Sequence, residues 1–147
     1  MKDDNCIFCK IANGEIPAAT LYEDENFRVI LDVFPATKGH ALIIPKEHYC
    51  NLYDLDKELA GKALILAQEM IHPLKEVLKC HGINIVQNNE SAAGQRVFHF
   101  HMHLIPRYEG DGVGVNWKSG KLSDVDKEEI LSLWTERTLS NGDFSGQ

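Results

Sequence analysis

Three histidines alternate with apolar residues in one short stretch, residues 98–106. His99, His101 and His103 occupy every second position, and the positions between them hold Phe98, Phe100, Met102 and Leu104. Successive side chains of a β-strand point to opposite faces, so a strand here places the imidazoles on one face, ~6–7 Å apart, and the apolar side chains on the other. A core strand has no structural need for three titratable rings. The row therefore predicts metal binding, proton transfer or nucleophilic attack.

The overall composition is that of an ordinary soluble globular protein, with 44% hydrophobic and 25% charged residues in a chain of 147. The net charge of −7 argues against a nucleic-acid partner, because duplex binding needs a broad basic face. No apolar run is long enough to span a membrane, and the polar, acidic start is unlike a signal peptide. The four cysteines form no secreted disulfide framework. We expect a cytoplasmic protein without a membrane partner.

Apolar periodicity predicts an α+β fold. The strongest helical pattern runs from about Asp56, a capping residue, to about Cys80, with Gly82 as its stop. Pro73 interrupts this pattern and predicts a kink or two shorter helices. The other predicted elements are a short helix at 6–14, a hairpin of strands at 20–23 and 27–32, and strands at 41–44 and 83–88 before the histidine strand. The strands show no regular βαβ alternation, so the sheet is antiparallel or mixed.

The end of the chain differs in character from the rest. Residues 109–114 are rich in glycine and acidic residues and predict a mobile loop. Ser123 is placed to cap a last helix that carries Ile130, Leu131 and Trp134 on one face. We expect a single domain over residues 1–147, with its core in residues 5–108 and a loop, helix and tail in residues 109–147.

The pair Cys6-x-x-Cys9 is half of a zinc site. A redox pair is the less apt interpretation, since the long helix and preceding strand of a thioredoxin-like motif are missing. Zinc needs two further donors, for which His48 and one histidine of the row are chemically suited. Cys50, two residues from His48, competes with it.

Two polar residues end otherwise apolar strands, Asp32 and Asn88. Each by itself is explained by solubility or by capping of the next loop. Read together with the apolar residues Ile7, Phe8, Ile30 and Leu42, the Asp32 carboxylate is suited to accept hydrogen bonds from ribose hydroxyls, while these apolar side chains enclose a base. Gly94 allows its loop to approach a phosphate closely. His40 is either a support for this site or a structural histidine.

Several motifs together resemble the histidine-triad (HIT) superfamily, in particular the zinc-containing bacterial members of its Hint-like branch. They are residues 99–105, 6–11, 14–17, 39–48 and 84–88, and the resemblance spans roughly residues 5–108. It implies a five-stranded antiparallel sheet with one long helix and a short N-terminal helix. It also implies a homodimer in which two such sheets join into a ten-stranded sheet.

The resemblance further implies a nucleotide-binding hydrolase or nucleotidyl transferase acting on purine nucleoside phosphoramidates and related nucleoside monophosphate derivatives. The implied catalytic residues are His101, the nucleophile that becomes nucleotidylated, and His103 with Gln95 on the phosphate or leaving group. The implied nucleotide-binding residues are Ile7, Phe8, Ile11, Ile30, Asp32, Leu42, Asn88, Gly94, Gln95, His101 and His103. The implied ligands of a structural zinc ion are Cys6, Cys9, His48 and His99. Arg96 stands where the family commonly has Ser or Thr.

Two other function classes fit the histidine row. One is a catalytic metalloenzyme with His99, His101 and His103 as ligands. The other is a nucleotide-sensing or protein-interaction module with weak or vestigial catalysis.

Overall fold

The computed structural model describes residues 2–141, which divide into two compact units at residue 113. The first unit extends a few residues beyond the expected core because a charged turn follows the last strand. Arg107 forms two hydrogen bonds of 2.9 Å with the Asp111 carboxylate and one of 2.7 Å with the carbonyl of Val113. The guanidinium holds the pKa of Asp111 well below its usual range, so the pair stays charged and closes the turn.

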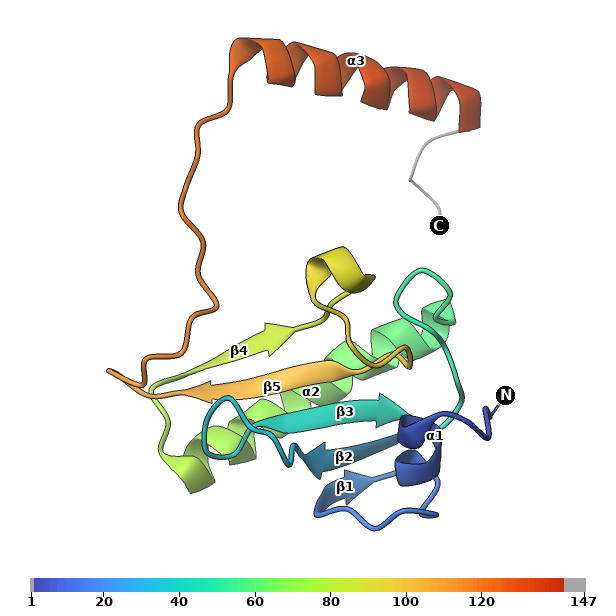
Figure 1. The fold of residues 1–147 in the computed structure, drawn as a ribbon, viewed down its shortest axis with the longest axis vertical. Helices are drawn as coiled ribbons and strands as arrows, with labels where there is room; N and C mark the ends of the chain where they lie inside the picture. Colours follow the sequence, from blue (N-terminus) through green and yellow to red (C-terminus); the bar gives the residue numbers. More distant parts are fainter. Residues whose placement is uncertain (1, 142–147) are drawn as a thin grey trace. The chain divides into compact units, whose positions relative to one another are not determined.

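The first unit is built on a five-stranded antiparallel sheet in the order β1-β2-β3-β5-β4, which confirms the α+β class (Figure 1). The strands are β1 (Thr20–Glu23), β2 (Phe27–Leu31), β3 (Ala41–Pro45), β4 (Gly82–Val86) and β5 (Met102–Arg107). β4 and β1 are the two edges. The strand that holds His103 is therefore interior and is flanked by β3 and β4.

The predicted histidine strand was wrong at its start, because β5 begins at Met102 and contains only His103 of the row. Before Met102 the backbone forms a hydrogen bond outside the sheet: the N–H of Phe100 donates to the carbonyl of Tyr49 over 2.6 Å. Phe98, expected on the apolar face, is 46% exposed, whereas Phe100 and the apolar residues after it are buried. The alternation of faces therefore holds only from Phe100 onward.

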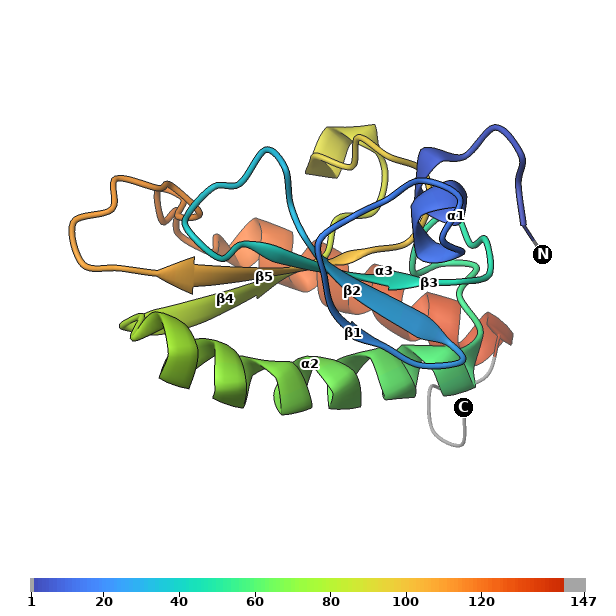
Figure 2. The same cartoon turned by 90° about the horizontal axis from the view of Figure 1, so that it is seen from below.

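The two α-helices of the first unit lie on opposite faces of the sheet, α1 (Ile7–Ala12) on one and α2 (Lys57–Leu78) on the other (Figure 2). A short 3₁₀ helix, η1 (Ser91–Ala93), follows β4. Asp56 caps α2, as predicted, by accepting from the N–H of Leu59. The prediction of two shorter helices was wrong, because α2 runs unbroken through the exposed Pro73. The prediction that Gly82 ends the helix was also wrong. The helix ends at Leu78, and its C-cap is Lys79, whose φ of 53° is left-handed; Gly82 already belongs to β4.

The core consists of two clusters, one on each side of the sheet. The larger cluster packs α2 against the sheet and includes Phe27, Val29, Ile43, Leu66, Met70, Phe100 and Leu104. The smaller cluster packs α1 against the other face and includes Ala12, Ile30, Leu42 and Ile44, with Phe8, Ile11 and Ala18 at its margin. Successive residues of β2 and β3 therefore contribute their side chains alternately to the two clusters. The smaller cluster fixes α1, and with it Cys6 and Cys9, over the sheet.

The second unit contains α3 (Asp124–Asn141). Ser123 caps it as predicted, since its hydroxyl accepts from the N–H of Asp126 over 3.0 Å. Ile130, Leu131 and Trp134 are each more than half exposed. The last part of the expected tail, residues 142–147, lies outside the described residues. No helix in the described chain is both long and apolar enough to cross a membrane.

Candidate metal and catalytic site

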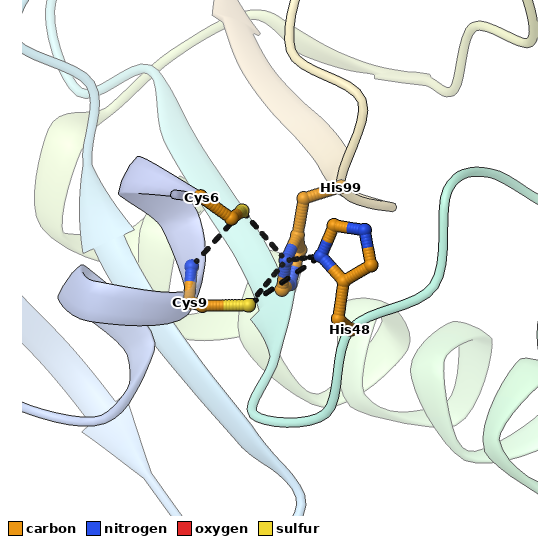
Figure 3. Close-up of side chains that lie close together, drawn as sticks. All are labelled: Cys6, Cys9, His48 and His99. Carbon is orange, nitrogen blue, oxygen red and sulfur yellow. Dashed lines mark hydrogen bonds between the residues drawn. The ribbon is translucent and has the colours of Figure 1, made fainter. Parts of the chain in front are cut away.

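Four potential metal ligands meet beside the first turn of α1 (Figure 3). His99 Nδ1 lies 3.3 Å from Cys6 Sγ, 3.4 Å from Cys9 Sγ and 3.2 Å from His48 Nδ1, and Cys9 Sγ lies 3.4 Å from His48 Nδ1. Zinc–ligand lengths give tetrahedral edges of ~3.4 Å between two nitrogens and ~3.6 Å between sulfur and nitrogen. The four atoms thus have nearly the spacing of a closed tetrahedral zinc site. Cys50, the competing donor, is not part of this cluster.

The tautomer of His99 supports metal binding. His99 Nε2 lies 2.8 Å from the carbonyl of Pro45, and a carbonyl only accepts, so Nε2 carries the proton. Complete burial lowers the pKa of His99 to about 4, which keeps the ring neutral. The lone pair of Nδ1 therefore faces Cys6, Cys9 and His48. A histidine ligand anchored by its other nitrogen is the usual arrangement around protein-bound zinc, so the donor set fits the ion.

His101 presents a free ring nitrogen. Its Nδ1 donates to the carbonyl of His99 over 2.7 Å, so the proton is on Nδ1 and Nε2 keeps its lone pair. Burial lowers the pKa of His101, which favours the neutral ring. The ring of Phe8 packs edge-on against it with centroids 5.0 Å apart. These contacts fix a neutral imidazole in one orientation, which is the state required of a nucleophile.

His103 is held in the opposite tautomer by a relay through His40. The N–H of Ala36 donates to His40 Nδ1 over 2.9 Å, so His40 carries its proton on Nε2. His40 Nε2 lies 2.9 Å from His103 Nδ1 and donates to it. Burial lowers the pKa of both histidines, that of His103 to about 4. His103 is therefore neutral with its proton on Nε2, a hydrogen-bond donor beside the lone pair of His101, whose ring centroid is 5.0 Å away.

The carboxylate of Asp32 stands beside this relay, with Oδ2 3.6 Å from His40 Nε2. Asp32, His40 and His103 lie close enough together to resemble a second metal site. The tautomers oppose that use, because the N–H of Ala36 occupies the lone pair of His40 Nδ1 and leaves a proton on Nε2. This arrangement is a hydrogen-bond chain, in contrast to the zinc-type cluster where the lone pairs converge.

Comparison with known proteins agrees with this geometry. The HIT domain family matches residues 13–110, about two thirds of the chain. The chain belongs to the HIT family. A HIT family protein from Bacillus anthracis has a similar crystal structure, with a TM-score of 0.81 and 41% identity over 91% of this chain and 97% of that one. A zinc-bound histidine triad family protein from Mycobacterium smegmatis has a TM-score of 0.72 and 36% identity over 95% and 98%. The adenosine 5'-monophosphoramidase hnt1 of Schizosaccharomyces pombe is 41% identical over 90% of this chain and 95% of its own.

The apolar residues predicted to hold a base differ in accessibility in this HIT chain. Ile30 and Leu42 are buried in the α1 cluster, at 4% exposure each. Phe8 and Ile11 are half-buried at the margin of that cluster, and Ile7 is 52% exposed. The accessible apolar surface of this group is thus provided by α1, while the two strand residues support it from beneath.

The predicted phosphate loop lies between β4 and the histidine segment. Gly94 has a φ of 93°, which favours glycine, and a Cβ there would lie 3.7 Å from the Asn88 amide nitrogen. The Gln95 side chain is buried and bonded within the protein. Arg96, the departure from the family pattern, is exposed. Sequence reasoning left His40 undecided, because only the pairing of Leu42 with His103 across β3 and β5 reveals how close it lies.

Proposed function

We propose that this HIT protein is a nucleotidyl hydrolase or transferase that cleaves the phosphorus–nitrogen bond of purine nucleoside phosphoramidates and related nucleoside monophosphate derivatives. The observation that carries the proposal is the lone pair of His101 Nε2, held on a neutral and oriented ring beside the Nε2–H of His103. The named activity of the fission yeast relative supports the same substrate class. Release of AMP from adenosine 5'-phosphoramidate by the purified protein tests it.

In this mechanism His101 Nε2 attacks the α-phosphorus and forms a bond to it while the phosphorus–nitrogen bond breaks. The amine leaves with a proton taken from water. The positive charge that develops on the His101 ring is stabilised by the carbonyl of His99, which already accepts from Nδ1. His103 donates its Nε2–H to a phosphate oxygen as negative charge shifts there. Water then attacks the phosphorus, and the bond from phosphorus to His101 Nε2 breaks. The proton of this water neutralises the hydroxide left by the first step, the nucleoside monophosphate is released and the ring of His101 is neutral again.

The remaining predicted residues, apart from Gln95, would bind the nucleotide. Asp32 accepts hydrogen bonds from the ribose hydroxyls, while Asn88 and the backbone near Gly94 face the phosphate and sugar. The apolar group formed by Ile7, Phe8, Ile11, Ile30 and Leu42 encloses the base. Phe8 has two roles, because it also packs on the ring of His101.

Zinc would be held by Cys6, Cys9, His48 and His99, with a structural role. Four protein donors leave no open position for a substrate or water, so the ion supplies anchoring and no chemical step. His99 is both a ligand and the source of the carbonyl that orients His101. The metal cluster therefore secures the start of the catalytic segment.

The relay predicts that His40 controls the rate through His103. His40→Ala should lower kcat about 10–100-fold, because His103 loses the donor that keeps its proton on Nε2. Without that proton it cannot donate to the charged phosphate oxygen, and a hydrogen bond to a charged group contributes about 1.5–3 kcal/mol. His40→Gln should recover part of this loss, since its amide NH₂ can replace the donor. Steady-state kinetics on adenosine 5'-phosphoramidate compare the variants. Equal losses in both would contradict the relay.

We also propose that the protein is a homodimer whose two sheets join through an edge strand, with α2 near the interface. Leu64, Ile65 and Val77 of α2 are each more than half exposed, and Ile85 of the edge strand β4 is 41% exposed. Light scattering after size-exclusion chromatography should give twice the chain mass of 16.6 kDa. A single-chain mass across micromolar concentrations would contradict the dimer.

A further inference from the structure

The amide of Gln95 has no hydrogen-bonding capacity left for a ligand. Its oxygen accepts from the N–H of Glu90 over 2.7 Å and from Asn51 Nδ2 over 3.3 Å. Its nitrogen donates to the carbonyl of Cys50 over 2.7 Å and to that of Val97 over 3.1 Å. A carboxamide offers two lone pairs and two N–H groups, and all four are used. The side chain is 4% exposed.

These four bonds join two segments that are distant in the sequence. Glu90 and Val97 bracket the loop that carries Gly94. Cys50 and Asn51 belong to the turn that follows His48, a ligand of the metal cluster. Two other bonds run alongside, from the N–H of Leu52 to Asn89 Oδ1 and from the N–H of Phe100 to the carbonyl of Tyr49. Gln95 is the centre of this connection.

The loop needs such restraint because its first residue is strained. Glu90 has φ 76° and ψ 157°, a conformation that is essentially restricted to glycine. Gln95 holds it from two sides, since its side-chain oxygen accepts from the N–H of Glu90 and its own backbone N–H donates to the carbonyl of Glu90. A strained residue persists only where its surroundings over-determine it.

We propose that Gln95 is a positioning residue, not a phosphate ligand: its amide holds the Glu90–Val97 loop closed against the turn after His48 and so sets the backbone at Gly94 for the substrate phosphate. This inference rests on the proposed function of the site, but it assigns Gln95 a different role from the one implied by the family resemblance. A direct ligand would need a free N–H, and a positioning residue acts through the loop.

A double-mutant cycle between Gln95 and Asn51 tests this assignment. Gln95→Ala should raise the KM for adenosine 5'-phosphoramidate and the Kd for AMP about tenfold, or about 1.4 kcal/mol. The same variant should change kcat less than threefold and leave the zinc content unchanged. Asn51→Ala should raise both constants about threefold, and the double variant should match Gln95→Ala because the two residues share one bond. Ser91→Ala, in the exposed part of the same loop, is the matched control and should behave as wild type.

Hydrogen exchange of the ligand-free protein supplies the second readout. Gln95→Ala should expose the Glu90 amide to faster exchange before any nucleotide is added. Loss of AMP affinity in Gln95→Ala with unchanged exchange at Glu90 and no effect of Asn51→Ala would overturn the proposal and favour a direct phosphate contact. Should Gln95→Ala fail to fold, Asn51→Ala alone must still weaken AMP binding. If the wild-type protein binds no nucleotide, the proposed function fails, while the exchange result still decides whether Gln95 holds the loop.

Discussion

Replacing His101 with alanine should reduce turnover of adenosine 5'-phosphoramidate by about 10³-fold or more, since the removal of a catalytic nucleophile can lower kcat by up to about 10⁶-fold. AMP binding should remain within about fivefold of wild type, because Asp32, the apolar group and the loop at Gly94 are all still present. The loss follows from the geometry: no other imidazole on this face has a free Nε2 lone pair fixed by a backbone carbonyl, among the residues that the structure describes. Single-turnover kinetics and calorimetric titration with AMP measure the two quantities.

His72→Ala is the matched control, since His72 is an exposed histidine of α2 on the other side of the sheet. It should keep full activity. Near-normal turnover by His101→Ala would contradict covalent catalysis at this ring. Tight AMP binding by a wild-type protein that turns over no phosphoramidate would instead favour a nucleotide-sensing module.

Replacing Cys9 with alanine should lower the midpoint of thermal unfolding by at least about 10 °C, or about 3 kcal/mol for a domain of this size. In the proposed zinc site the variant would lose one of four ligands, and with it the binding free energy that zinc would add to the folded state. Cys9 is also 2% exposed, so its replacement leaves α1 less well packed against the sheet. Scanning calorimetry beside a zinc assay measures both effects.

Cys50→Ala is the control that distinguishes the effect of losing a proposed zinc ligand from the effect of losing a cysteine elsewhere. Cys50 is half-buried and lies two residues from His48 but outside the metal cluster, so its variant should keep both zinc and the melting temperature. A Cys9→Ala protein that melts as wild type would refute the structural role of the ion. If chelation abolished turnover while the melting transition stayed in place, zinc would have to act in the chemistry.

The sequence predicted those parts of the structure that depend on residues close together in the chain, such as helix caps and ligand spacing. The Cys6-x-x-Cys9 spacing puts both thiols on the first turn of α1, and Asp56 and Ser123 cap the helices that follow them. Alternation placed His101 and His103 near one another, although His101 lies just before the strand. The fold class followed from the order of the elements.

Most of the features that the sequence did not predict depend on contacts between residues that are far apart in the chain. The chain bends at residues 97–99 and does not join the sheet there, because the N–H of Phe100 donates to the carbonyl of Tyr49, which lies after β3. Lys79 ends α2 in a conformation that glycine usually adopts, and its N–H caps the carbonyl of Lys75. His40 lies within hydrogen-bonding distance of His103 because of the register between β3 and β5. The side-chain amide of Gln95 forms hydrogen bonds with two segments that are far apart in the sequence. None of these follows from residue spacing alone.

The most direct test of the account is to trap the covalent intermediate. Protein mixed with adenosine 5'-phosphoramidate is quenched without acid, because a phosphorus–nitrogen bond to histidine is acid-labile, and its peptides are then analysed by mass spectrometry. The account predicts an adenylyl group on the peptide that contains His101, localised to that ring by fragmentation and missing from His101→Ala. Rapid turnover with no adduct, or with the adduct on a different residue, would contradict it.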